Sequence, residues 1–166
     1  MSNSAVHSTP SAIITPAELL RHWQGHRDLT KRVIVAFPEK EFFTFSIGGM
    51  RTADALTREL LSIAGPGIQE ITSDQTGQFS EEIPELKTKD DYLVRWDETT
   101  NIIDTHWPKI AEARFREVLN LFGQYKSPVI ESIFYFIDNE IHHRGQMYVY
   151  LRALGIEPPA FWDRAH

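Results

Sequence analysis

One long helical segment near the C-terminus restricts the possible folds of this chain most strongly. Ser127-Pro128 offers a hydroxyl N-cap followed by a proline at the first helical position, and from there a helix can run about 27 residues to Leu154. Gly155 then supplies a C-terminal cap, and Pro158-Pro159 prevents the helix from continuing. We therefore expect an architecture in which other helices pack along this one.

Three further helices are predicted upstream. The first begins at Thr15, where Thr15-Pro16-Ala17-Glu18 has the chemistry of a capping box, and its apolar stripe runs to about Phe37. The second runs from about Met50 to Ala64, and the third from Thr88 to about Trp107. Four such helices favour an all-α fold, an up-down antiparallel four-helix bundle. We expect residues 1–14 to form a polar leader and residues 15–166 to form the single domain.

Some connections are less clearly defined by the sequence. Lys40 to Gly49 is expected to be a connector, and Gly65-Pro66-Gly67 should stop or kink the second helix, after which Ile68 to Ile71 can continue briefly. Pro108 to Tyr125 is compatible with a short helix, an extended segment or both.

Composition excludes several classes of protein. The 166 residues include no cysteine, so disulfides and thiolate metal ligands are excluded. The net charge of −6 and the scattered basic residues argue against a nucleic-acid partner. No apolar run approaches the ~20 residues that span a membrane. A cytoplasmic location fits these features.

The last predicted helix carries a stripe that combines aromatic and polar side chains. Phe136, Asn139, His143, Gln146 and Tyr150 recur at steps of three and four, so they share one face. His143 is either a metal ligand or a histidine of the core or rim that is hydrogen-bonded to a carbonyl or carboxylate. Gly145 costs about 1 kcal/mol in a helix, which suggests a close approach of backbone or ligand there.

The segment EIHHRGQMYVYLRALGIEPPAFW resembles the terminal helix of the DinB/YfiT-like superfamily of four-helix-bundle metalloenzymes. The resemblance extends more loosely to HWQGHRDLTKRVIVAFPEKEFFTFSIGGMRTADAL. It implies a nickel or zinc site with one histidine from the second helix and two, spaced i and i+4, from the fourth. These positions fall on Glu59, Asn139 and His143, with Ser62 as the alternative to Glu59. Two of the three expected imidazoles are therefore replaced.

Two functions follow from this comparison. The first is a divalent-metal hydrolase or thiol transferase acting on a small-molecule substrate, with His142, Glu140 or Tyr150 as candidates for proton transfer. The second is a metal-free module that binds a small molecule, or a partner, in a pocket lined by Phe136, Gln146 and Tyr150. The resemblance also implies a homodimer.

Other aromatic and imidazole side chains have simpler interpretations. His22 and His26 are spaced i, i+4 on the first helix, but a solvated or rim pair explains them without a metal. His106 lies near the C-terminus of the third helix, where the helix dipole favours it. Phe161 and Trp162 are expected either to fold back over the end of the bundle or to join a dimer interface.

Overall fold

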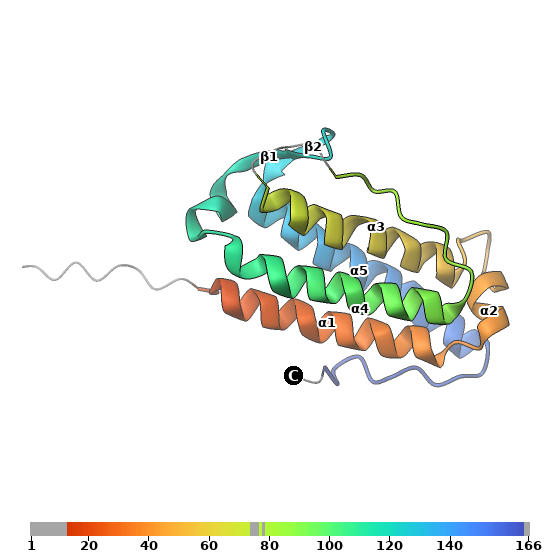
Figure 1. Cartoon of the computed structure of the whole chain (residues 1–166). Coiled ribbons are helices and arrows are strands. Elements are labelled where there is room, and N and C mark those ends of the chain that lie inside the picture. Colours follow the sequence, from red (N-terminus) through yellow and green to blue (C-terminus); the bar gives the residue numbers. More distant parts are fainter. Residues whose placement is uncertain (1–12, 74–76, 78, 165–166) are drawn as a thin grey trace, which may run out of the picture.

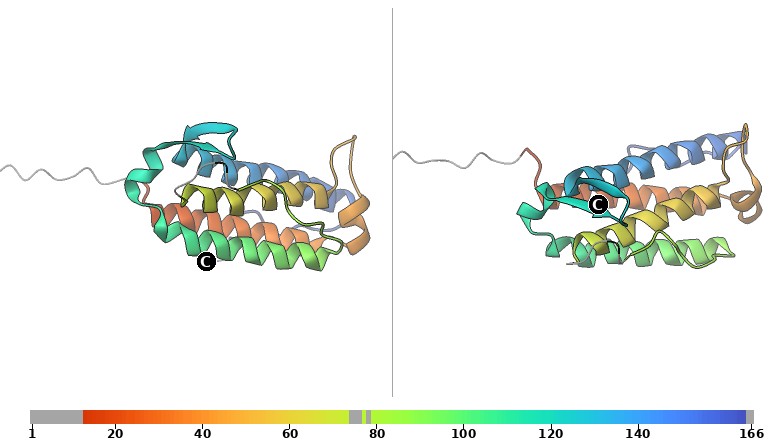
Figure 2. Two further views of the ribbon diagram at one scale, coloured as in Figure 1. Left: turned by 45° about the horizontal axis from the view of Figure 1, so that its top comes forward. Right: turned by 90° about the horizontal axis from the view of Figure 1, so that it is seen from above.

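The computed structural model describes residues 13–73, 77 and 79–164. Its four long helices are α1 (Pro16–Ala36), α3 (Ala53–Ile71), α4 (Lys89–His106) and α5 (Val129–Ala153). They lie side by side along a common axis, and α1 and α3 each pack against both α4 and α5 (Figures 1 and 2). The predicted all-α four-helix bundle is confirmed.

The helix directions do not alternate strictly along the chain. Residues 79–88 return along the length of the bundle before α4 begins, so α3 and α4 run parallel (Figure 1). The start of α4 accordingly lies beside the end of α1, where Nζ of Lys89 donates to the backbone oxygen of Phe37 at 2.6 Å. The long crossover makes this order possible, and it leaves α3 antiparallel to α5.

The predicted starts of α1 and α4 and the predicted end of α5 are confirmed. Thr15 accepts a hydrogen bond from the backbone of Glu18, whose carboxylate accepts from the backbone of Thr15, and Thr88 and Asp91 repeat this capping box at α4. At the end of α5, Gly155 adopts φ 75°, which a residue without Cβ tolerates best.

The start of α5 differs from the prediction. Ser127 does not cap the helix, because its hydroxyl lies 2.8 Å from that of Ser132 and no side chain caps Pro128. Residues Tyr125–Pro128 instead form strand β2, which pairs antiparallel with β1 (Val118–Leu121). Extended backbone at residues 125–128 is compatible with Pro128, which restricts the residue before it to that region.

The other connections resolve the alternatives that the sequence left open. Lys40 to Gly49 is not wholly a connector, because Glu39–Thr44 forms a short helix, α2. Short 3-10 turns at Trp107–Lys109 and Glu112–Arg116 precede the β-hairpin. The helix α3 continues through Pro66, with Gly65 packed on Thr99 and Gly67 packed on Phe136.

The core consists of two apolar clusters with a buried polar layer between them. One cluster lies at the hairpin end of the bundle and contains Trp23, Ile68, Trp107, Phe115, Leu121 and Phe136 among others. The other lies at the opposite end and contains Phe37, Phe42, Leu61, Tyr92, Trp96 and Tyr150 among others. The polar layer consists of His26, Arg27, Thr30, Glu140 and Arg144, each at most 6% exposed.

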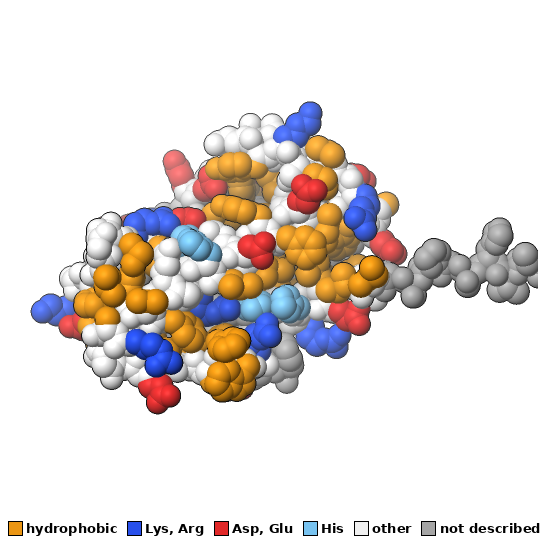
Figure 3. Space-filling model, turned by 180° about the vertical axis from the view of Figure 1, so that it is seen from behind, with side chains coloured by type: hydrophobic (Ala, Val, Ile, Leu, Met, Phe, Trp, Pro, Cys, Tyr) orange, Lys and Arg blue, Asp and Glu red, His pale blue; other side chains and the backbone are white. Residues whose placement is uncertain are grey.

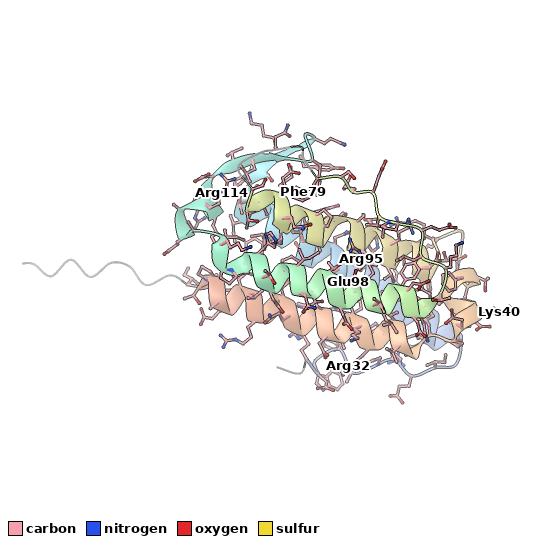
Figure 4. All side chains as sticks on the ribbon, viewed as in Figure 1. Arg32, Lys40, Phe79, Arg95, Glu98 and Arg114 are labelled. Carbon is pink, nitrogen blue, oxygen red and sulfur yellow. The ribbon has the colours of Figure 1, made fainter. Side chains whose placement is uncertain are left out.

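The C-terminal tail returns along α1 (Figure 1). Arg32 of α1 lies beside this tail (Figure 4) and pairs with the carboxylate of Asp163 at 3.1 Å. Phe161 and Trp162 are 67% and 71% exposed, so the described residues leave most of both side chains uncovered.

Two expectations concern the chain as a whole. Most of the leader predicted for residues 1–14 lies outside the described residues. Within the described part of the chain, no helix is both long and apolar enough to cross a membrane.

Candidate functional site

The three positions identified in the sequence meet between α3 and α5. Glu59 lies on α3, and Asn139 and His143 lie one turn apart on α5. Oε1 of Glu59 lies 3.0 Å from Nε2 of His143 and accepts a hydrogen bond from the amide of Asn139 at 3.3 Å. The antiparallel packing of α3 and α5 thus brings together residues that are 80 or more positions apart.

A fourth residue, Arg51, joins this group and was not predicted. It precedes α3, and its guanidinium Nη1 donates to Oε2 of Glu59 while Nη2 lies 3.4 Å from Nε2 of His143. The hydroxyl of Tyr150 donates to the backbone oxygen of Arg51 at 2.8 Å, which holds the start of this segment against α5. Its only sequence signal was its place just before the second helix.

Hydrogen-bond chemistry assigns the roles within the group. A carboxylate only accepts, so Nε2–H of His143 is assigned as the donor of the 3.0 Å contact to Glu59. Arg51 can also only donate, so its 3.4 Å approach to the same nitrogen is a contact and not a hydrogen bond. His143 is 4% exposed, which matches the prediction of a buried histidine hydrogen-bonded to a carboxylate.

The charge of Glu59 is stabilised by its neighbours. Burial acts to raise the pKa of the Glu59 carboxyl, but hydrogen bonds and charge interactions from His143 and Arg51 outweigh burial and lower it. Glu59 is therefore ionised at neutral pH and ion-paired with a guanidinium.

These residues do not fit the nickel or zinc site that the resemblance implies. Such sites use three imidazole or carboxylate ligands, whereas this group offers one imidazole, one carboxylate and an amide that donates to the carboxylate. A guanidinium already neutralises the carboxylate. Within the described ranges, no group of three His, Asp or Glu side chains is arranged to hold a metal ion.

A cavity of about 830 Å³ opens beside Glu59. It lies between α3, the segment around Glu81, the β-hairpin and the first turns of α5. The side chains that form its walls are Ala55, Arg58, Glu59, Ser62, Ile63, Glu81, Leu121, Phe122, Tyr125, Ser127, Glu131, Ser132, Tyr135 and Phe136. On the face seen from behind, acidic and apolar side chains lie next to one another where the hairpin covers the bundle (Figure 3).

The predicted pocket is only partly correct. Phe136 lines the cavity, but Gln146 and Tyr150 do not, because they lie further along α5, away from the hairpin. Tyr150 is fully buried in the second core cluster, and Gln146 lies between the two histidines, 3.0 Å from Nε2 of His142 and 3.4 Å from Nδ1 of His143. The hairpin and Glu81 form part of the cavity wall, and the sequence did not predict that either lies there.

The remaining candidates near the site have other contacts. Ser62 lines the cavity but donates its hydroxyl hydrogen bond to the backbone oxygen of Glu59. His142 is exposed. The prediction of a close backbone approach at Gly145 is wrong, because a Cβ added there would meet nothing within 4 Å, and the alternative of a ligand at Gly145 stays a prediction.

Glu140 faces away from His143, into the buried polar layer. Its carboxylate accepts from Thr30 at 2.7 Å and from the Trp23 indole at 3.3 Å, and it lies 3.6 Å from Arg27 and 3.8 Å from Arg144. These contacts join α1 to α5 and give Glu140 a structural role. Its i, i+4 spacing to Arg144 is also common on solvated helix faces, so the sequence did not reveal the layer.

The other histidines also have partners in the fold. His22 is exposed and His26 is buried, with their Nε2 atoms 3.2 Å apart. Burial, together with the charge of Arg144, lowers the pKa of His26 to about 3, so this imidazole is neutral. Nδ1 of His106 lies 2.6 Å from the hydroxyl of Thr72.

Comparisons with known proteins agree on one family. The model of the family described as "DinB family" matches residues 1–165. A DinB-like protein of Bacillus subtilis, YjoA, superposes with a TM-score of 0.69 at 17% identity, covering 89% of this chain and 99% of that one. A DinB-like protein of Bacillus cereus gives a TM-score of 0.67 at 14% identity, covering 87% and 95%. These structural likenesses concern the fold alone. No curated protein matches this chain.

Proposed function

The chain belongs to the DinB family, and we propose that this member binds a small organic molecule in the cavity beside Glu59 without using a divalent metal. A metal-dependent hydrolase or thiol transferase, which the resemblance implies, is the competing function. The two differ in what occupies the space between Glu59 and His143.

The position of Arg51 is the observation that carries the proposal. Its guanidinium pairs with Glu59 and approaches His143, so a positive charge already lies where the resemblance implies a metal ion. A divalent ion about 4 Å from a guanidinium would be repelled by roughly 8 kcal/mol at an effective dielectric constant of ~20. One imidazole and one carboxylate are a small ligand set to offset that repulsion.

The cavity supports the binding part of the proposal. Its volume of about 830 Å³ lies within the usual range for small-molecule sites, roughly 300–1,000 Å³. Its walls combine apolar rings such as Phe122 and Phe136 with hydroxyls and carboxylates, the mixture by which such sites hold and orient a ligand.

Metal content tests the metal-free part. Untagged protein purified without chelator is compared with Arg51→Ala and His143→Ala by elemental analysis and by titration with Zn²⁺ and Ni²⁺. We expect no stoichiometric metal in the wild type and measurable Zn²⁺ binding only in Arg51→Ala, because removal of the guanidinium frees Glu59 and His143. Near-stoichiometric metal in the wild type that disappears in His143→Ala would instead establish the metalloenzyme.

A blocked cavity tests the binding part. Ala55 lies on the cavity wall and is partly exposed, so Ala55→Trp should place an indole ring in the cavity and obstruct it without disturbing the core. In a thermal-shift screen of small organic molecules, we expect saturable shifts in the wild type that are absent in Ala55→Trp. Equal shifts in both proteins would place binding elsewhere and contradict the proposal.

A further inference from the structure

The cavity beside Glu59 has an unequal distribution of charge. Three carboxylates line it, those of Glu59, Glu81 and Glu131, against one basic side chain, Arg58. Glu59 lies on α3, Glu81 in the connection between α3 and α4, and Glu131 in the first turn of α5. The acidic character is therefore produced by the tertiary structure, and no stretch of sequence displays it.

The basic side chain of the cavity is committed to other contacts. Nη2 of Arg58 donates to the backbone oxygens of Ile83 and Pro84 at 2.8 and 3.0 Å. These bonds hold the guanidinium to the segment that follows Glu81. Arg58 thus orders one wall of the cavity.

Two of the three carboxylates have no compensating contact in the described part of the chain. Glu59 is paired with Arg51 and His143, whereas no described residue forms a hydrogen bond or ion pair with the carboxylate of Glu81 or of Glu131. Glu81 is nonetheless partly buried. Partial burial removes some of the water around the Glu81 carboxylate, and a bound cation would offset that loss, whereas Glu131 is exposed and adds its charge from the rim of the cavity.

The titration behaviour of the walls agrees with an excess of negative charge. Burial, with a contribution from the charge of Glu59, raises the pKa of the Glu81 carboxyl. Burial also raises the pKa of the Tyr135 phenol, and Glu59, Tyr125 and Glu81 raise it further. Both groups therefore experience the negative potential that the carboxylates create.

Aromatic rings complete the cavity. Phe122, Tyr125, Tyr135 and Phe136 lie on its walls, and the rings of Phe122 and Tyr125 meet edge to face with centroids 6.4 Å apart. The faces of such rings attract ammonium groups, and their area suits an apolar body attached to the charge. Carboxylates combined with aromatic rings are a recurring means of recognising organic cations.

We propose that the ligand of this cavity is an organic cation, an ammonium group attached to an apolar or aromatic body, held by Glu81 and Glu131 and by the surrounding rings. This inference rests on the proposed function, since it names the chemical class of the molecule that the cavity binds. It also predicts discrimination against anions of the same shape, which the two unpaired carboxylates repel.

Three probes of similar shape and different charge test this inference. Binding of phenethylamine, 2-phenylethanol and 3-phenylpropionate is measured by calorimetry and thermal shift on the full chain at pH 7.5. We expect phenethylamine to bind at least tenfold more tightly than the alcohol, and the carboxylate to bind least. The Glu81→Gln/Glu131→Gln double variant should lose at least tenfold in affinity for the amine and little for the alcohol.

A matched double variant controls for the mutations themselves. Glu82→Gln/Asp138→Asn removes two exposed carboxylates, one adjacent to Glu81 and one seven positions after Glu131 on α5, that do not line the cavity, so it should bind like the wild type. Benzyltrimethylammonium, whose charge does not titrate, should bind more weakly as the pH falls and Glu81 takes up a proton.

The outcomes separate the two proposals. Equal affinity for all three probes, or unchanged amine binding in Glu81→Gln/Glu131→Gln, overturns the ligand class while the small-molecule function stands. Absence of saturable binding for every probe in the wild type overturns the ligand class, and the small-molecule function is then decided by the wider screen against Ala55→Trp. Loss of amine binding in the matched control as well would show that net charge, and not the cavity, is responsible.

Discussion

The most informative single change is the replacement of Gly67 by alanine, with Gly145 as its matched control. Both glycines lie inside helices with ordinary helical backbone, Gly67 in α3 and Gly145 in α5. Alanine is favoured over glycine by about 1 kcal/mol in a helix interior, so both substitutions share that gain. Any difference between them reports what the added methyl group meets.

The structure fixes the sign of that difference. A Cβ at Gly67 would lie 2.5 Å from Cζ of Phe136 and 3.0 Å from its Cε2, whereas a Cβ at Gly145 would meet nothing within 4 Å. Inserting a methyl group into a packed core costs roughly 1–3 kcal/mol. We therefore expect Gly145→Ala to raise the free energy of unfolding by up to about 1 kcal/mol. Gly67→Ala should be less stable than Gly145→Ala by about 1–3 kcal/mol.

Chemical denaturation followed by circular dichroism measures both values. Phe136→Leu, alone and combined with Gly67→Ala, completes a double-mutant cycle. Replacing the ring with the smaller leucine side chain should remove the clash with the new Cβ at position 67. We expect a favourable coupling of at least about 1 kcal/mol between the two positions. If Gly67→Ala stabilised the protein as much as Gly145→Ala, the close contact of α3 with Phe136 would be refuted.

Three further predictions concern the buried layer and the tail. Glu140→Gln leaves two buried guanidinium groups without their shared carboxylate, and urea denaturation should show a loss of about 3–5 kcal/mol. The pKa of His26 is lowered to about 3 in the fold, so below pH ~6.5 the unfolded chain binds a proton that the folded chain does not. The free energy of unfolding should therefore fall as the pH drops, by at most about 1.4 kcal/mol per pH unit. His26→Leu should reduce that slope. The homodimer stays a prediction: light scattering should show a dimer that Phe161→Ser/Trp162→Ser converts to monomer, because both rings are highly exposed in the single chain.

Much of the fold could be predicted because its signals are local. The capping boxes at Thr15 and Thr88 use residues within one turn, and Gly155 needs only its own backbone freedom. The start of α5 was misplaced because the same Ser127-Pro128 pair suits both a helix cap and the end of a strand. Pairing with Val118–Leu121 decides between them, and that pairing is not a local property.

The candidate site divides in the same way. Asn139 and His143 could be predicted to share a face from their spacing, and Glu59 could be aligned with them through the family resemblance. Arg51 could not, because it lies outside the helix and reaches the site through tertiary packing alone. The amide of Asn139 donates to a carboxylate, an orientation that no sequence pattern specifies.

The sequence by itself determined the four long helices, the capping boxes of α1 and α4, and the polar stripe on α5, because each depends on residues a few positions apart. The order of helix directions, the cavity with its three carboxylates and the guanidinium beside His143 were decided only by the tertiary structure. Each of these requires segments separated by tens of residues to pack together, and the packing of the whole bundle determines which segments meet.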